Sequence, residues 1–178
     1  MIIIMGIAGA GKGTQGHLLA DRGYTLISTG ELFREAMASG KYPELLQGRL
    51  VSDEETIQIL NDTIAKLHPD EEFILDGFPR NVAQTRWVLD QIESGKLGSP
   101  VIIHLILSKE ASRERLKLRH RPDDTEEAIN RRFEIYDHET KPILNLFEEH
   151  GLRVCDIDAD RSIEAVHQSV VKCIEAKA

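Results

Sequence analysis

The chain opens with MIIIMGIAGAGKGTQG (1–16), and this segment indicates its architecture. The apolar run at 1–6 predicts a buried strand, and the stretch that begins at Lys12 predicts a helix. Glycines between them let successive backbone N–H groups point at phosphate oxygens, beside the positive end of the helix. Lys12 adds a charge for the β- and γ-phosphates, and Thr14 adds a hydroxyl for phosphate or magnesium. The segment therefore predicts a nucleotide phosphate site; the alternative is a glycine-rich turn with a surface lysine.

The composition limits the class of protein. With 178 residues, 41% hydrophobic and 29% charged, the chain has enough apolar residues for one compact domain. A net charge of −8 argues against nucleic acid or an anionic membrane as a partner. Cys155 and Cys173 are too few and too far apart in sequence for a disulfide framework or a zinc site, so reduced thiols and a cytoplasmic location are expected. The apolar opening is too short for a signal peptide or membrane span.

Short apolar runs alternate with longer amphipathic segments along the whole chain. The predicted strands lie at 1–6, 24–29, 73–78, 101–107 and 153–158. The predicted helices lie at 12–22, 30–38, 53–67, 81–94, 109–119, 124–149 and 161–176. Pro142 is expected to kink or break the helix at 124–149. This alternation predicts an α/β protein, in one domain over 1–178, with a mostly parallel sheet covered on both faces.

Five motifs, in this order, resemble those of the adenylate kinases and related nucleoside monophosphate kinases. They are GIAGAGKGT (6–14), ISTGELFR (27–34), GRLVSDE (48–54), LDGFPRNVAQ (75–84) and RPDDTEEAINRRFEIY (121–136). The resemblance implies a three-layer α/β/α P-loop kinase fold with a five-stranded parallel sheet. It also implies an AMP-binding subdomain at about 30–67 and a lid at about 119–123. The implied activity is Mg²⁺-dependent phosphoryl transfer from ATP to AMP, giving two ADP, by a monomer.

The resemblance also implies roles for individual residues. ATP would be bound by Gly9, Ala10, Gly11, Lys12, Gly13, Thr14, Arg115, Arg119 and Arg161. AMP would be bound by Thr29, Arg34, Arg49, Leu50, Val51, Gly77, Phe78, Pro79, Arg80, Gln84, Arg121 and Arg132. Catalysis would depend on Lys12, Arg80, Arg119, Arg121, Arg132, Asp123 and Asp124. Arginine suits phosphoryl transfer because its planar fork binds phosphate and stays charged when buried. The alternative for the arginine-rich segment 113–132 is a solvated basic surface.

Three aspartates have two interpretations each. Asp76 ends a predicted strand, and by resemblance it would hold Mg²⁺ together with Thr14, through water. The alternative is a turn aspartate ahead of Gly77. Asp123 and Asp124 follow Pro122 at a predicted helix start. By resemblance they would pair with the lid arginines; the alternative is that they cap this helix and offset its dipole.

The choice of acceptor depends on two residues. Thr29 and Gln84 match the positions at which adenylate kinases read adenine, and a glutamine amide can both donate and accept. The alternative for Gln84 is an ordinary solvent-facing helix residue. UMP, CMP or dAMP as acceptor, and a nucleotide-sensing protein without transfer, are the alternative functions.

The predicted lid and the predicted AMP-binding subdomain are both shorter than is usual in the family. Only His120 separates Arg119 from Arg121, and the span 38–48 in the acceptor subdomain is short. We expect so short a lid to admit water, which would give modest turnover and some ATP hydrolysis. His120 would be an exposed loop residue or a partial replacement for lid contacts to ATP.

Overall fold

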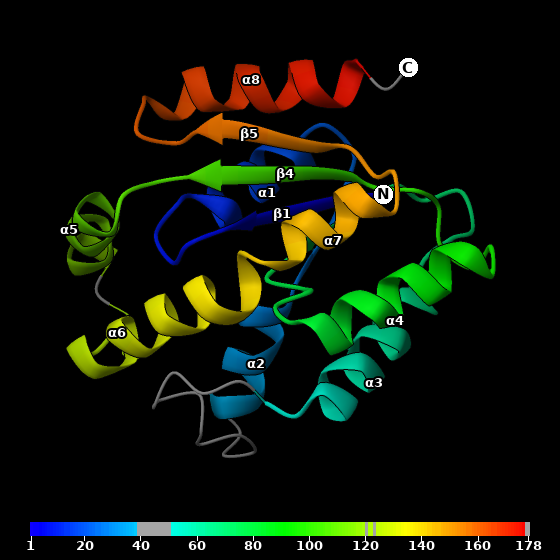
Figure 1. The fold of residues 1–178 in the computed structure, drawn as a ribbon, viewed down its shortest axis with the longest axis horizontal. Coiled ribbons are helices and arrows are strands. Elements are labelled where there is room, and N and C mark those ends of the chain that lie inside the picture. Colours follow the sequence, from blue (N-terminus) through cyan, green and yellow to red (C-terminus); the bar gives the residue numbers. More distant parts are fainter. Residues whose placement is uncertain (39–50, 120, 123, 177–178) are drawn as a thin grey trace.

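A sheet of five parallel strands, in the order β2-β3-β1-β4-β5, forms the centre of the molecule (Figure 1). The structure is a computed structural model that describes residues 1–38, 51–119, 121–122 and 124–176. The strands are β1 (Ile2–Gly6), β2 (Thr25–Ser28), β3 (Phe73–Asp76), β4 (Val101–Ile106) and β5 (Val154–Asp158). They confirm the five predicted strands and the α/β class.

Helices follow the strands along the chain and cover both faces of the sheet. They are α1 (Lys12–Ala20), α2 (Thr29–Ala38), α3 (Asp53–Ile64), α4 (Val82–Glu93), α5 (Lys109–Arg119), α6 (Glu126–Ile135), α7 (Ile143–Glu149) and α8 (Ile163–Glu175). The single helix predicted at 124–149 is three pieces, with a π-helical turn at Tyr136–Thr140 between α6 and α7. Pro142, which has no backbone N–H to continue a helix, stands directly before α7, so the predicted break is confirmed.

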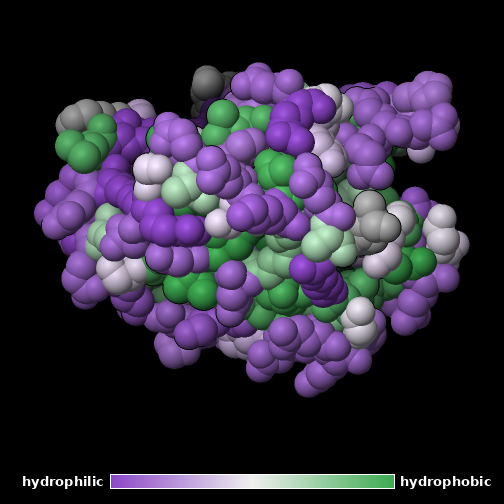
Figure 2. Space-filling model, turned by 90° about the horizontal axis from the view of Figure 1, so that it is seen from above, coloured by the Kyte–Doolittle hydropathy of each residue, from purple (hydrophilic) through white to green (hydrophobic). Residues whose placement is uncertain are grey.

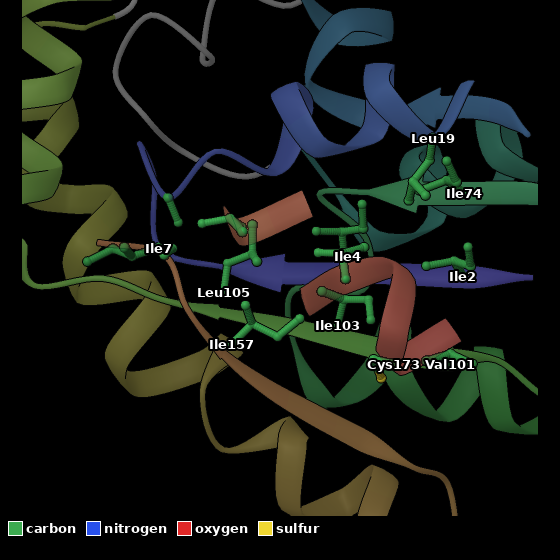
Figure 3. Packing of buried hydrophobic residues seen from close by; sticks show 14 of the residues in the cluster. Ile2, Ile4, Ile7, Leu19, Ile74, Val101, Ile103, Leu105, Ile157 and Cys173 are labelled. Atoms are coloured by element: carbon green, nitrogen blue, oxygen red, sulfur yellow. The ribbon is translucent and has the colours of Figure 1, made fainter. Parts of the chain in front are cut away.

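The apolar residues of β1 alternate between two cores. Ile2 and Ile4 pack in one cluster with Leu19 of α1 and with α8, whereas Ile3 packs in a second cluster with α4 and α7. Figure 3 shows the first cluster, in which Ile4 lies close to Ile103 of β4. Because both faces are buried, the strand reads as a continuous apolar run in the sequence.

The two cysteines form a disulfide, which corrects the expectation of reduced thiols. Cys155 lies in β5 and Cys173 in α8, 18 residues apart in sequence, and their Cα atoms are 6.5 Å apart. Helix α8 returns along the sheet beside β5 (Figure 1), so tertiary packing joins residues that sequence distance separates. The cysteines therefore no longer support the predicted cytoplasmic location, which was inferred from reduced thiols.

The surface is largely polar on the face that carries α8. Figure 2 shows this face with hydrophilic residues predominant and smaller hydrophobic areas between them. Among the described ranges, no helix combines the length and apolar character needed to cross a membrane.

Candidate active site

A cavity of about 760 Å³ opens at the carboxyl ends of the strands. Strand β1 has β3 on one side and β4 on the other, so the chain changes direction across the sheet at this point. Ligands of open α/β sheets bind outside the carboxyl ends of the strands at such a switch point. The loops after β1, β3 and β5 and the first turn of α2, which directly follows β2, all contribute residues to the cavity wall.

The glycine-rich loop lies between β1 and α1 at this edge. Gly11 precedes α1 with a φ of 95°, in the left-handed region that favours glycine. The Nζ of Lys12 donates to the backbone oxygens of Gly6, at 2.8 Å, and Ile7, at 3.0 Å. Burial lowers the pKa of Lys12 to about 8, although the charge of Asp76 opposes this shift. The loop thus holds a half-buried ammonium group at the cavity wall, where a phosphate could reach it.

Seven arginines from separate parts of the chain line the same cavity. They are Arg34, Arg80, Arg115, Arg119, Arg121, Arg132 and Arg161. Three of them, Arg80, Arg119 and Arg132, lie close enough to Lys12 for their charges to lower its pKa further. The predicted phosphate-binding arginines of the described ranges are therefore brought together, and Arg115, Arg119, Arg121 and Arg132 of the segment 113–132 all line the cavity.

Arg80 is fixed through both its side chain and its backbone. Its Nε donates to the oxygen of Gly77 at 2.6 Å, and its own backbone oxygen accepts from Thr140 Oγ1 at 2.7 Å. Gly77 has a φ of 81°, and a Cβ there would lie 2.7 Å from Thr29 Oγ1 and 2.9 Å from Arg80 Nη2. Only glycine therefore fits this turn. Burial lowers the pKa of Arg80, with Asp76 opposing.

Asp124 pairs with Arg119 at the end of α5 and with Arg132 of α6. Its carboxylate accepts from Arg119 Nε at 2.8 Å and Nη2 at 2.6 Å, and from Arg132 Nη1 at 2.8 Å. Burial favours a higher pKa for Asp124, but the hydrogen bonds and charges of the two arginines lower it below its ordinary value. Thr125, and not Asp124, caps α6, because its Oγ1 accepts from the backbone of Ala128. Asp123 and His120 lie outside the described residues.

Asp76 and Thr14 present oxygen donors at the phosphate loop. Asp76 ends β3, is 9% exposed, and accepts from Ser28 Oγ at 3.2 Å. A Cβ on Gly13 would lie 3.7 Å from Asp76 Oδ2, so the carboxylate faces the loop. Thr14, in the first turn of α1, is exposed to the cavity. Hard oxygen donors in small number suit Mg²⁺, which keeps most of its waters.

The predicted acceptor residues are divided between the cavity and the core. Thr29 donates to the backbone oxygens of Asp76 and Gly77, at 3.2 and 2.9 Å, and can still accept from a ligand. Gln84 is 1% exposed, so its alternative as a solvent-facing residue is wrong. The predicted acceptor residues that line the cavity are Thr29, Arg34, Val51, Gly77, Pro79, Arg80, Gln84, Arg121 and Arg132. Phe78 is instead buried in the core against Trp87. Arg49 and Leu50 lie outside the described residues.

The opposite end of the cavity is formed by α5, the loop after β5 and the start of α8. Arg115 Nη2 donates to the oxygen of Ala159 at 2.9 Å, and Arg161 Nε donates to the oxygen of Asp158 at 3.0 Å. The side chains of Leu118, 78% exposed, and Ile163, 54% exposed, also line this end. An apolar, partly open mouth with arginines beside it suits a flat aromatic base.

Comparison with known proteins agrees with this geometry. A family model described as adenylate kinase matches residues 4–152. The adenylate kinase of Thermobifida fusca is 32% identical over 99% of both chains, and that of Maricaulis maris is 34% identical over 99% of both. The adenylate kinase of Prochlorococcus marinus strain MIT 9301 is 34% identical over 95% of both. This chain belongs to the adenylate kinase family. As an adenylate kinase it is an enzyme of ATP:AMP phosphoryl transfer.

One part of this adenylate kinase site was missed in the sequence. Tyr136, at the start of the π-helical turn, lines the cavity, and its hydroxyl lies 2.7 Å from His104 Nε2. His104 Nδ1 lies 2.7 Å from Asp156 Oδ1, so a chain of hydrogen bonds crosses from β5 to the cavity wall. Burial, with Asp137 and Asp156, raises the pKa of Tyr136 to about 12. The signal was present: a histidine interrupts the apolar run VIIHLIL at 101–107.

Proposed function

We propose that the cavity binds ATP and AMP at opposite ends and transfers the γ-phosphoryl group where Lys12 meets Arg80, Arg119 and Arg132. The observation that carries this proposal is the convergence of these four cations, from the phosphate loop, the loop after β3, α5 and α6, around one point. Asp76 and Asp124 offset part of the positive charge of this cluster, and a bound polyanion would offset more of it. The polyphosphate of two bound nucleotides supplies that anion.

The ATP end is the phosphate loop with the mouth beside α5 and α8. The loop N–H groups and Lys12 receive the β- and γ-phosphates, at the positive end of α1. Arg115 is held by the oxygen of Ala159 at this mouth, which supports its predicted role in binding ATP. Leu118 and Ile163 provide apolar surface on which the base would pack.

The AMP end lies between α2, the loop after β3 and the start of α4. Arg34 and Arg80 receive the monophosphate, and the buried Gln84 and Thr29 face the base. Val51 belongs to a small apolar cluster with Phe33 and contributes to the pocket wall. This assignment places the acceptor phosphate next to Arg80 and therefore next to Lys12.

The transfer itself needs alignment and charge neutralisation. An oxygen of the AMP phosphate attacks the γ-phosphorus of ATP, the bond to the β-phosphate oxygen breaks, and two ADP result. Arg80, Arg119, Arg132 and Lys12 would stabilise charge on the transferring group, since preformed donors cost no reorganisation during the reaction.

The donor set of the site fits a magnesium ion. Asp76 and Thr14 would hold it, Asp76 through water, and Ser28 orients the carboxylate. When bound, Mg²⁺ neutralises phosphate charge and orients the β- and γ-oxygens.

The proposal is tested by measuring ADP formed from ATP and AMP, with Mg²⁺ and with excess EDTA. UMP, CMP and dAMP are run beside AMP, and ADP release from ATP alone measures hydrolysis. We expect AMP to be the best acceptor, EDTA to abolish transfer, and Lys12→Ala to abolish it too. Lys96→Ala, which removes an exposed lysine outside the cavity lining, is the matched control and should retain activity. Equal and negligible ADP formation by wild type and Lys12→Ala would refute the proposal in favour of a nucleotide sensor.

A further inference from the structure

Asp53 joins the starts of two helices beside the acceptor end of the cavity. It is the first residue of α3, and its Oδ1 accepts from Gln84 Nε2 at 2.7 Å and from Asn81 Nδ2 at 2.9 Å. Asn81 caps α4, because its Oδ1 accepts from the backbone N–H of Gln84 at 2.9 Å. Helices α3 and α4 lie side by side (Figure 1). One carboxylate oxygen therefore connects both helix starts to the Gln84 amide.

The Gln84 amide is held in a single orientation. Its Oε1 accepts from the backbone N–H of Arg80 at 2.8 Å, and a backbone N–H can only donate. Its Nε2 donates to Asp53, whose carboxylate can only accept. Gln84 is 1% exposed, so water cannot replace either partner if the amide turns over. If the Gln84 amide rotated by 180°, its Nε2 would face the Arg80 N–H, which is also a donor, and its Oε1 would face the Asp53 carboxylate, which is also an acceptor.

With its partners among the described residues counted, the Gln84 amide has one N–H and one oxygen lone pair left for a ligand. Gln84 lines the cavity, so these remaining groups are available to a base. A 6-aminopurine offers an acceptor at N1 beside a donor at N6, whereas a 6-oxopurine offers a donor at N1 beside an acceptor at O6. A freely turning glutamine matches both patterns, but an amide held in one orientation matches one.

We propose that Asp53 is a positioning residue for acceptor choice: by fixing the Gln84 amide, it makes the site prefer a 6-aminopurine over a 6-oxopurine monophosphate. The inference rests on the proposed function, in which Gln84 faces the acceptor base. The competing role for Asp53 is to stabilise α3 by placing a negative charge in its first turn. That role predicts a change in stability with no change in acceptor preference.

The test compares AMP with inosine monophosphate, which differs only by the 6-oxo group and the N1 proton. The kcat/KM of each acceptor is measured at saturating MgATP for wild type and Asp53→Asn. The asparagine amide can present either its oxygen or its Nδ2 to Gln84, so the constraint from residue 53 is lost and only the Arg80 N–H still opposes rotation of the Gln84 amide. We expect the AMP preference to fall several-fold, by less than the roughly tenfold value of one good paired readout of a base, because the Arg80 N–H still favours the original orientation. The ratio does not depend on the fraction of folded enzyme.

Two further variants complete the design. Glu54→Gln removes an exposed charge from the same helix turn and should keep the wild-type ratio. Asp53→Glu retains a carboxylate acceptor and should keep much of the wild-type preference for AMP over inosine monophosphate. An unchanged ratio in Asp53→Asn, or a wild type that does not discriminate, overturns the inference.

Failure of the proposed function has a different signature. A wild type that makes no ADP from ATP and AMP refutes the transfer itself. A Gln84→Leu variant with wild-type KM for AMP removes Gln84 from the acceptor site. If wild type is active and Gln84→Leu is impaired toward AMP, an unchanged ratio in Asp53→Asn refutes the positioning role alone.

Discussion

Arg119 and Asp124 are joined by two hydrogen bonds, from Nε to Oδ2 at 2.8 Å and from Nη2 to Oδ1 at 2.6 Å. The same Oδ1 accepts from Arg132 Nη1 at 2.8 Å, so one carboxylate offsets part of the positive charge of two predicted catalytic arginines. Its side chain is 3% exposed, while those of Arg119 and Arg132 are 30% and 18% exposed. Asp124 therefore connects α5 to α6.

Replacing Asp124 by alanine should destabilise the protein. Two arginines would lose a buried partner, but both could be partly hydrated, so we expect a loss of about 2 kcal/mol. For a chain of this size that corresponds to a fall in Tm of about 4–8 °C by calorimetry. Glu134→Ala, which removes an exposed acid from α6, should leave Tm nearly unchanged. Equal shifts in the two variants would contradict the role assigned to Asp124.

The same pair should make stability depend on acid pH. The folded-state pKa of Asp124 lies below its ordinary value of 3.8. Its stabilisation is therefore fully present above about pH 4 and is lost as pH falls through the lower folded-state pKa. We expect the free energy of unfolding of wild type and Asp124→Ala, measured with urea, to converge at low pH. A constant difference down to the acid transition would be inconsistent with this linkage.

Lys12 should limit activity at alkaline pH. Burial lowers its pKa to about 8, from 10.5, so the free enzyme loses this charge as pH rises through that value. We expect kcat/KM for ATP to fall above about pH 8, while kcat holds to higher pH because bound phosphates favour the protonated lysine. Lys12→Arg, which stays charged, should lose the alkaline decline even if its activity is lower. A decline at the same pH in Lys12→Arg would assign the titration to another group.

Gln84→Leu should separate the two nucleotide sites. Leucine has nearly the same size but cannot donate or accept, so we expect the KM for AMP to rise by about tenfold or more and that for ATP by less than about twofold. Gln91→Leu on the same helix, outside the cavity lining, is the control. Equal effects on both KM values would remove Gln84 from the acceptor site.

Tyr136→Phe should leave His104 without its partner at the cavity wall. His104 is 5% exposed. The Asp156 carboxylate can only accept a hydrogen bond, so the proton of His104 lies on Nδ1. Nε2 therefore accepts from the Tyr136 hydroxyl. An unsatisfied buried nitrogen costs about 1–3 kcal/mol, and we expect Tm to fall accordingly. Tyr24→Phe, a half-buried tyrosine in the same apolar cluster, should have a smaller effect. Equal losses would show that the hydrogen bond contributes little.

Reduction of the Cys155–Cys173 disulfide should lower stability without changing the chemistry. Opening a loop that spans 18 residues removes about 3 kcal/mol by chain entropy. We expect a lower Tm in dithiothreitol and an unchanged kcat at 25 °C, because neither cysteine lines the cavity. The native protein should show no free thiol until reduced, and Cys155→Ala/Cys173→Ala should behave like the reduced form. Two titratable thiols in the native protein would contradict the bridge.

Local patterns were enough to predict the five strands and the phosphate loop. Each strand is a short apolar run buried on both faces, and the loop has its glycines, Lys12 and Thr14 in one continuous segment. Helix bounds were close as well, apart from the π-helical turn at Tyr136–Thr140, which no periodicity indicated. These features depend on neighbours in the sequence, so the sequence by itself determined them.

Other features depend on which segments meet, and only the tertiary structure decided them. The Cys155–Cys173 bridge needs α8 to return beside β5, and the Asp53–Gln84 contact needs the starts of α3 and α4 to face each other. Gln84, predicted from resemblance, proved to be buried with its amide already held in one orientation. Hydrogen-bond partners that are distant along the chain leave no periodic trace in sequence, because their choice follows from packing the helices on the sheet.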